Sequence, residues 1–237
     1  MGSEPKLIER IVPPVVRVVE GEQPPQDVSL FPEESAIIRN AVEKRRRDFR
    51  AGRACARLAL AALGVHDVAI PSGPRREPLW PPGIVGSITH CPGYVAAAVT
   101  HREHLLALGI DAEEWGAAGS DLESFICTPA ELDRYRESEY SHWRTLVFSA
   151  KESLFKALYP LRHFELEFSD VEVTLELPGK REGGEQATSP LMMPPGRFSV
   201  SPVRELPSLA ADIERIEGRF LLRGHHIFTT AWLPANS

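Results

Sequence analysis

The sequence predicts an α+β fold made of two similar halves. Each half contains a strongly helical stretch, at residues 33–63 and at 143–158, where apolar side chains recur at three- and four-residue spacing. Each half also ends in a predicted hairpin, at residues 86–99 and at 219–232, where β-branched and aromatic residues are concentrated. A helix and a closing hairpin in both halves indicate two related α/β units within one chain.

The two predicted halves meet near residues 105–110. We expect an N-terminal half at 1–108, which carries an arginine cluster, and a C-terminal half at 109–237, which carries a set of carboxylates. The chain has 237 residues, 43% of them hydrophobic, which is enough to bury a substantial core. No clear sequence repeat relates the halves, so their similarity is predicted from the order of elements.

In the N-terminal half, residues 15–19 predict a short strand that precedes a proline-containing loop. The helical pattern of 33–63 ends at Gly64, a residue type that favours the C-cap. A helix of this length is unusual in a globular domain, so we expect a break at Gly52.

In the C-terminal half, residues 105–110 predict a strand, and Pro129 is placed to open a helix. The clearest helix of the chain is 143–158, which has one continuous apolar stripe. Residues 171–177 alternate between polar and apolar types, as expected of a half-solvated strand. The polar, glycine- and proline-rich residues 178–196 predict a loop.

Composition excludes several classes of protein. A net charge of −6 argues against a general nucleic-acid binder, which usually has a basic surface. Three widely separated cysteines favour reduced thiols in the cytoplasm over a disulfide framework. The first ten residues lack the apolar segment of a signal peptide, and no run of about 18 apolar residues occurs. We therefore expect a cytoplasmic protein that binds neither nucleic acid nor membrane.

Three carboxylates and a lysine occur in two short motifs. Asp111 and Glu113 follow an apolar run two residues apart, so on a strand both would project from one face. Glu152 and Lys156 are four residues apart on a predicted helix and share a face. Such oxygen ligands suit Mg²⁺. On spacing alone, a surface ion pair and a solvated acidic loop remain open alternatives.

Basic residues are concentrated in the first predicted helix. Seven cations fall within fourteen residues, namely Lys44, Arg45, Arg46, Arg47, Arg50, Arg53 and Arg57. Because the guanidinium fork can bind two phosphate oxygens, the cluster indicates a site for a polyanion. The alternative is a solvated face that balances nearby glutamates. His90, beside a predicted turn, could belong to the same site or could simply be a hydrogen-bonded turn residue.

Five segments between about residues 30 and 160 carry a resemblance to a known family. They are the basic segment 44–57, Glu77-Pro78-Leu79-Trp80-Pro81, the segment 86–94 around Thr89-His90, Gly109-Ile110-Asp111-Ala112-Glu113, and Phe148-Ser149-Ala150-Lys151-Glu152-Ser153 through Lys156. In this order they resemble the 4′-phosphopantetheinyl transferases of the surfactin-synthetase-activating type. The likeness is greatest to the subgroup of the enterobactin-synthase transferase and actinobacterial enzymes.

The resemblance implies a pseudo-dimer of two α/β halves, with coenzyme A bound in the cleft between them. It implies transfer of the 4′-phosphopantetheine arm of coenzyme A to a serine of an acyl or peptidyl carrier protein, with 3′,5′-ADP as the by-product. It also implies a magnesium cofactor, for which manganese could substitute. The carriers of such enzymes serve fatty-acid, polyketide or nonribosomal-peptide synthesis.

The resemblance further implies a role for each site residue. Asp111, Glu113 and Glu152 would hold the metal ion, and Asp111, Glu152 and Lys156 would form the catalytic group that also contacts coenzyme A. Glu152 would act as general base towards the carrier serine, and Lys156 would neutralise charge on the phosphate. The remaining coenzyme A contacts would be Arg45, Arg53, Ser72, Gly73, Pro74, Arg75, Thr89 and His90.

Two other functions remain possible at this point. One is a non-catalytic module that binds a carrier protein or coenzyme A, and the other is a magnesium-dependent nucleotide phosphohydrolase. The four intact residues of the acidic motifs argue against the first. We expect a monomer, and we expect the carrier to dock between Trp115 and Trp143.

Overall fold

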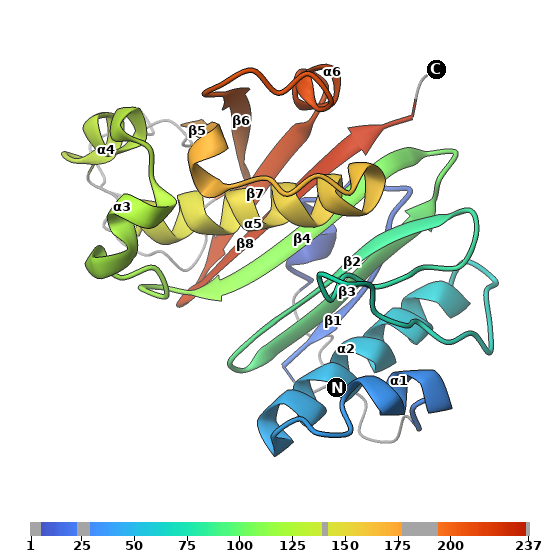
Figure 1. Ribbon diagram of the computed structural model, residues 1–237. Helices are drawn as coiled ribbons and strands as arrows, with labels where there is room; N and C mark the ends of the chain where they lie inside the picture. The colour runs from blue at the N-terminus through green and yellow to red at the C-terminus, as the bar shows by residue number, and fades with distance from the viewer. Residues whose placement is uncertain (1–5, 23–28, 139–141, 177–193, 236–237) are drawn as a thin grey trace.

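The structure is a computed structural model that describes residues 6–22, 29–138, 142–176 and 194–235. It contains two antiparallel sheets, one with the strand order β1-β3-β2 and one with the order β4-β8-β7-β6-β5. Figure 1 shows α2 packed on the first sheet and α5 packed across the second. The mixed α+β class predicted from the sequence is confirmed.

The chain passes from one sheet to the other between β3 and β4. The elements before this point are η1 (Ile8–Arg10), β1 (Arg17–Gly21), α1 (Pro32–Ile37), α2 (Glu43–Ala61), β2 (Ile84–Cys91) and β3 (Tyr94–His101). Those after it are β4 (Leu105–Glu114), η2 (Ser120–Leu122), α3 (Glu123–Ile126), α4 (Pro129–Tyr135), α5 (Trp143–Arg162), η3 (Phe168–Asp170), β5 (Val171–Glu176), β6 (Gly196–Pro202), α6 (Ala210–Ile213), β7 (Glu217–Arg223) and β8 (His226–Pro234). The predicted boundary at 108/109 falls inside β4, and the division into domains stays a prediction.

The predicted break at Gly52 is wrong. The helical region is interrupted earlier, between Ile37 and Glu43, and Gly52 lies inside the continuous helix α2. A Cβ atom at Gly52 would stand 2.8 Å from Cγ2 of Ile88 on β2. The glycine therefore serves the close packing of α2 on its sheet, which outweighs the low helix propensity of glycine.

The predicted cap, turns and hairpins are confirmed. Gly64 has a positive φ of 78°, and the N–H of Val65 bonds back to the carbonyl of Leu60, 3.0 Å away, which closes α2. Gly93 also has a positive φ, 74°, in the tight turn between β2 and β3. Strands β7 and β8 form the C-terminal hairpin, and their turn contains Gly224.

Helix α5 lies directly against β4. A Cβ atom at Gly109 would stand 1.9 Å from the carbonyl oxygen of Ser153, so only glycine permits this approach. The predicted apolar stripe of α5 is buried throughout; it comprises Trp143, Leu146, Val147, Ala150, Leu154, Ala157 and Leu158. Glu152 and Lys156 lie outside this stripe and are only partly buried, as predicted.

Strand β4 meets β2 through side chains. The backbone N–H groups of Ile110 and Ala112 donate to the hydroxyl oxygens of Ser87 and Thr89, each over 3.1 Å. These bonds fix Thr89 beside the acidic end of β4. The junction between the two sheets is therefore where residues from both halves of the chain meet.

Three clusters of buried apolar residues support this arrangement. One lies between α5 and the five-stranded sheet, and another lies between α2 and the three-stranded sheet. The third is central and joins the sheets; it contains Ile8, Ile11 and Val12 from the N-terminal segment with Leu108, Ile110, Phe228 and Trp232. The N-terminal segment thus helps to hold the two sheets together.

The remaining predictions have mixed outcomes. Pro129 opens α4 and β5 alternates in burial, as predicted. Leu177 and most of the predicted loop 178–196 lie outside the described residues, whereas Gly196 itself begins β6. The sequence did not predict β6, α3 or α6. Within the part of the chain that the structure describes, none of the helices is long and apolar enough to cross a bilayer.

Candidate active site

The buried carboxylate of Asp111 is the centre of the site. Asp111 is only 2% exposed, although it lies near the end of β4. Its Oδ1 accepts a hydrogen bond from Nζ of Lys156 over 2.5 Å and a longer one, of 3.3 Å, from the hydroxyl of Thr89. Its Oδ2 accepts from the hydroxyl of Ser149 over 2.8 Å. A buried carboxylate with three such partners is held in one orientation.

Two turns of α5 provide the other groups. Ser149, Glu152 and Lys156 recur at three- and four-residue spacing, so all three side chains reach the same side of the helix. Ser149 is fixed from behind by Thr229 of β8, whose hydroxyl donates to the carbonyl of Ser149 over 2.8 Å. The close packing of α5 on Gly109 also determines how near these side chains come to Asp111, because Gly109 and Asp111 lie on the same strand.

Burial and the neighbouring negative charges make ionisation of Glu113 and Glu152 less favourable. Burial, together with the charge of Asp111, raises the pKa of Glu113 from 4.5 to about 7. Burial also raises the pKa of Glu152, and Asp111 adds to this effect while Lys156 opposes it. The site therefore favours any cation that can neutralise several carboxylates at once.

Lys156 is the cation already present. Burial alone would lower the pKa of its ammonium group, but the charges of Asp111 and Glu152 outweigh that effect and raise the pKa. The side chain is 28% exposed and its Nζ bonds to Asp111. Lys156 therefore stays charged at neutral pH, with part of its surface open to an anionic ligand.

The predicted metal ligands come together only in part. Asp111 and Glu113 project from one face of β4, and Glu152 approaches them from α5 closely enough to raise the pKa of Glu113. Among the described ranges, however, no group of three His, Cys, Asp or Glu side chains is arranged to hold a metal ion. The donor set, three hard oxygen ligands that destabilise one another, fits Mg²⁺ in chemistry.

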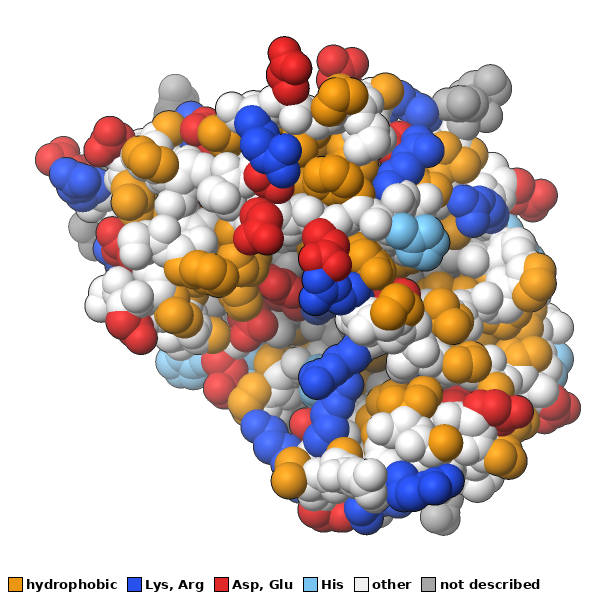
Figure 2. Space-filling model, in the orientation of Figure 1, with side chains coloured by type: hydrophobic (Ala, Val, Ile, Leu, Met, Phe, Trp, Pro, Cys, Tyr) orange, Lys and Arg blue, Asp and Glu red, His pale blue; other side chains and the backbone are white. Residues whose placement is uncertain are grey.

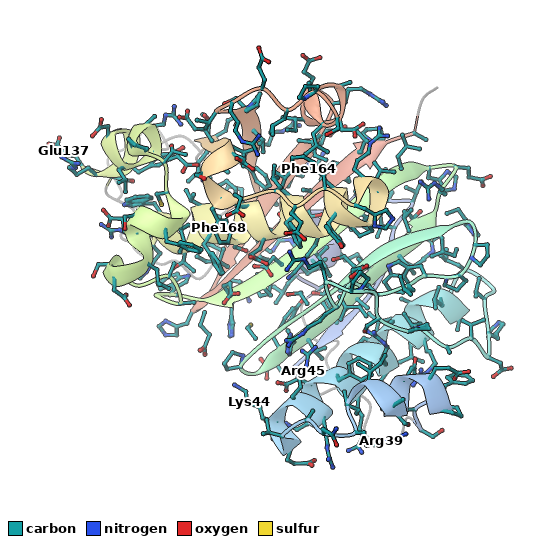
Figure 3. All side chains as sticks on the ribbon, viewed as in Figure 1. Arg39, Lys44, Arg45, Glu137, Phe164 and Phe168 are labelled. Carbon is teal, nitrogen blue, oxygen red and sulfur yellow. The ribbon has the colours of Figure 1, made fainter. Side chains whose placement is uncertain are left out.

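Basic residues lie across the junction, on the N-terminal half. Figure 2 shows a recess between the two halves, with acidic side chains along its upper side and basic ones along its lower side. Arg45, on the first turns of α2, is half-buried and points towards the strands in Figure 3. His90, at the end of β2, lies 3.7 Å from Asp48. Partial burial lowers the pKa of His90; Asp48 opposes this, whereas Lys156 and Arg45 add to it.

The arginine cluster of residues 45–57 does not form a single exposed surface. Arg57 bonds to both carboxylate oxygens of Glu34, over 2.9 and 2.8 Å. Arg53 is 4% exposed, and burial lowers its pKa to about 10. Its Nε donates to the carbonyl of Ile70 over 2.7 Å and its Nη2 to the hydroxyl of Ser72 over 3.0 Å. Arg53 therefore supports the loop that contains Ser72.

That loop holds the other predicted ligands of the N-terminal half. Ser72 and Pro78 pair in an isolated antiparallel β-bridge, and the N–H of Gly73 donates to the carbonyl of Glu77 over 2.9 Å. These contacts make residues 72–78 a compact turn. Arg75 lies at its tip and forms an ion pair with Glu165, beyond the end of α5. The loop and the catalytic helix are therefore linked across the two halves.

Known proteins resemble this chain over both halves. The family model "4'-phosphopantetheinyl transferase N-terminal domain" matches residues 33–100, and the model "4'-phosphopantetheinyl transferase superfamily" matches residues 107–188. The 4'-phosphopantetheinyl transferase Npt of Nocardia iowensis is 39% identical over 193 residues, which cover 81% of this chain and 87% of that protein. The chain belongs to the 4′-phosphopantetheinyl transferase family.

Two further relatives agree with this assignment. The 4'-phosphopantetheinyl transferase PptT of Mycobacterium tuberculosis is 41% identical over 154 residues, 64% of this chain and 68% of that protein. Enterobactin synthase component D of Escherichia coli (strain K12) is 40% identical over 127 residues, 52% of this chain and 59% of that protein. This 4′-phosphopantetheinyl transferase moves phosphopantetheine from coenzyme A to carrier proteins.

The structure of the transferase adds residues that sequence reasoning did not single out. Ser149 and Thr229 hold Asp111 and α5 in place, and Glu34 anchors the loop through the N–H of Ile70, 3.0 Å away. Lys151, inside the recognised motif, is buried and donates to Glu131 over 2.7 Å. Its position next to Glu152 in the motif could have drawn attention to Lys151. Because the side chain is buried against Glu131, however, Lys151 stabilises the fold rather than contacting the substrate.

Proposed function

We propose that this transferase uses a magnesium ion to transfer the 4′-phosphopantetheine arm to a serine hydroxyl of an acyl or peptidyl carrier protein, releasing 3′,5′-ADP. The observation that carries the proposal is the single cluster formed by Asp111, Lys156 and Glu152 beside the basic recess of the N-terminal half. The cluster of carboxylates and Lys156 suits a pyrophosphate with its cation, and the basic recess suits the phosphate on the nucleotide.

The metal would be held by Asp111, Glu113 and Glu152, and manganese could replace magnesium. When bound, it would stabilise negative charge on the pyrophosphate oxygens. The raised pKa values of Glu113 and Glu152 support this ligand set, because a cation would offset the burial and the neighbouring negative charge that raise them. Asp111 would keep Lys156 oriented whether or not the cation is present.

Glu152 would accept the proton of the carrier serine, directly or through one water molecule. Burial raises the pKa of Glu152 and so favours proton uptake, whereas a bound cation would reduce this gain. Glu152 is also partly exposed, and a cavity of about 180 Å³ opens beside it, lined by Phe155 and Phe168. Lys156 would stabilise the charge that develops on the phosphate under attack.

Coenzyme A would lie in the recess, with its nucleotide on the N-terminal half. Arg45 and His90 border this recess, Thr89 already contacts Asp111, and residues 72–75 form a supported loop nearby. Arg53 would act from beneath that loop, through Ser72, as well as by its positive charge. We retain the pseudo-dimer as a proposal, supported by one long helix on an antiparallel sheet in each half, although the sheets have three and five strands.

The deciding experiment is mass spectrometry of an apo carrier protein incubated with the enzyme, coenzyme A and Mg²⁺. We expect the carrier to gain one phosphopantetheine arm and 3′,5′-ADP to appear. Glu152→Gln should nearly abolish the transfer, whereas Glu176→Gln, a change of the same kind on an exposed side chain of β5, should not. Phosphate release without carrier modification would favour a phosphohydrolase, and binding without turnover would favour a non-catalytic module.

The proposal extends to the setting of the enzyme. We infer a cytoplasmic enzyme, because the cysteines Cys55, Cys91 and Cys127 are free thiols in the structure, and we retain the monomer as a proposal. The carrier would dock on the side of α5 that exposes Glu152, between Trp115 and Trp143. Residues 139–141 of that interval lie outside the described residues.

A further inference from the structure

An ion pair joins the loop 72–78 of the N-terminal half to the segment that follows α5. Nε of Arg75 donates to Oε1 of Glu165 over 2.8 Å, and Nη2 of the same guanidinium contacts Oε2. Both oxygens of the carboxylate therefore face the same edge of the guanidinium. Because the partners are 90 residues apart in sequence, the pair links the two halves of the chain.

The arginine is presented by a rigid loop. The N–H of Arg75 donates to Oε2 of Glu77 over 2.9 Å, and the N–H of Arg76 donates to the carbonyl of Gly73 over 3.0 Å. The start of the loop is held at Ile70, whose N–H bonds to Glu34 and whose carbonyl bonds to Arg53. The backbone of Arg75 is thus fixed, and only its side chain has freedom to change partners.

The glutamate belongs to the other half. Glu165 lies between His163, which ends α5 in a left-handed conformation, and the short helix η3. Figure 3 labels Phe164 and Phe168, which flank this segment; Phe164 lies above α5 and Phe168 at its level, whereas Arg45 lies well below the helix. Glu165 therefore reaches Arg75 from the side of the recess that carries the catalytic helix.

The pair is open to exchange. The side chains of Arg75 and Glu165 are 50% and 58% exposed, and ion pairs at such exposure are weak. The same two N–H groups that bind this carboxylate can bind two oxygens of a phosphate. A phosphate carries more charge than a carboxylate, so it would displace Glu165 if it arrived at the loop.

We propose that Glu165 is a specificity-determining residue that competes with the 3′-phosphate of coenzyme A for the guanidinium of Arg75. The inference rests on the proposed function, which places the nucleotide in the recess on the N-terminal half, near the loop of residues 72–75. Glu165 reduces the contribution of Arg75 to binding and so weakens the preference of the enzyme for a 3′-phosphorylated nucleotide. Loss of its charge strengthens that preference.

The test compares nucleotides with and without the 3′-phosphate. We expect Glu165→Gln to lower the KM for coenzyme A about two- to five-fold, the range of a weak exposed pair, with kcat unchanged. The KM for 3′-dephospho-coenzyme A should not change. Calorimetric titration should show the same difference between 3′,5′-ADP and 5′-AMP, independently of catalysis.

Two variants control the measurement. Glu167→Gln removes a nearby negative charge that acts on Arg75 without a hydrogen bond, so it should have a smaller effect on coenzyme A. In an Arg75→Gln background, Glu165→Gln should have no effect on either nucleotide. Equal KM values for wild type and Glu165→Gln, or an equal change for both nucleotides, would overturn the inference. An inactive wild-type enzyme would instead refute the proposed function.

Discussion

The hydroxyl of Ser149 on α5 donates to Oδ2 of Asp111 on β4, 2.8 Å away, and the same hydroxyl lies 2.8 Å from that of Thr229 on β8. One serine therefore connects the catalytic helix to two neighbouring strands of the sheet. The bond leaves Oδ1 of Asp111 for Lys156 and Thr89. The orientation of the central carboxylate thus depends on a side chain that takes no part in the proposed chemistry.

Replacement of Ser149 by alanine should destabilise the protein by about 1–2 kcal/mol, because the buried Asp111 loses one hydrogen bond. Urea denaturation measures this change as a lower midpoint. Ser153→Ala is the matched control, since Ser153 is equally buried on α5 but bonds only to the carbonyl of Ala150 in its own helix. If the two variants unfold at the same urea concentration, the Ser149–Asp111 bond does not stabilise the fold.

Replacement of Asp111 by asparagine should lower the transfer rate at least about 100-fold, the usual effect of losing a preorganised charge in an active site. The change preserves the size of the side chain but removes the charge that holds Lys156 and would bind the cation. The rate of carrier modification is measured over a range of Mg²⁺ concentrations. Glu114→Gln, on the exposed end of the same strand, should remain active with an unchanged response to Mg²⁺. Normal magnesium dependence in the Asp111 variant would exclude Asp111 as a ligand.

Two glycine substitutions test how the helices approach their sheets. Gly109→Ala should destabilise the protein by about 3 kcal/mol or more, because its Cβ would overlap the backbone of α5 at Ser153. Gly52→Ala should cost less, about 1–2 kcal/mol, because its Cβ would press against one side-chain methyl, Cγ2 of the β-branched Ile88, rather than against backbone, and better helix propensity offsets part of this cost. Thermal unfolding measures both variants. A large loss at Gly52 with none at Gly109 would contradict the packing described for both helices.

These glycines also show what the sequence could and could not predict. Helix α5 was predictable because its apolar residues repeat along one face, and the hairpin of β2 and β3 because Pro92-Gly93 separates two β-rich runs. The interruption before Glu43 was not, because no proline or glycine marks it, whereas Gly52 carries the usual signal for a break but packs against Ile88. Strand β6 alternates at Phe198 and Val200, but the polar segment before it masks this signal.

The site was predictable only where its residues lie in short motifs. Asp111, Glu113, Glu152 and Lys156 come from two such motifs. In the structure Lys156 bonds to Asp111, and Glu113 lies near enough to Asp111 and Glu152 to feel their charges, whereas the roles of all four residues stay predictions. Thr229 could not be found in this way, since it is 80 residues from Ser149 in sequence and contacts it only because β8 pairs with β4. The internal partners of Arg53 and Arg57 were likewise hidden, because they depend on the path of the chain from α1 to the loop.

The last prediction concerns the dependence of stability on pH at Glu113. In the folded protein the pKa of Glu113 is about 7, above its ordinary value of 4.5, because the side chain is partly buried beside Asp111. Between these two pH values the folded state holds a proton that the unfolded state has released. The contribution of Glu113 to stability therefore falls as pH rises from 4.5 to 7, and it stays unfavourable above 7.

Glu113→Gln removes this effect, so the variant should be more stable than wild type at pH 8, by on the order of 2 kcal/mol after allowance for solvent screening. At pH 4.5 the two proteins should have nearly equal stability. Urea denaturation at both pH values, without divalent cations, measures the difference. Glu114→Gln, at the exposed end of β4, should show no such dependence.

Added Mg²⁺ should narrow or reverse the difference at pH 8, because it would stabilise the ionised carboxylate in wild type. A variant that is less stable than wild type at pH 8 without Mg²⁺ would show that ionised Glu113 stabilises the fold, contrary to the burial and repulsion described here.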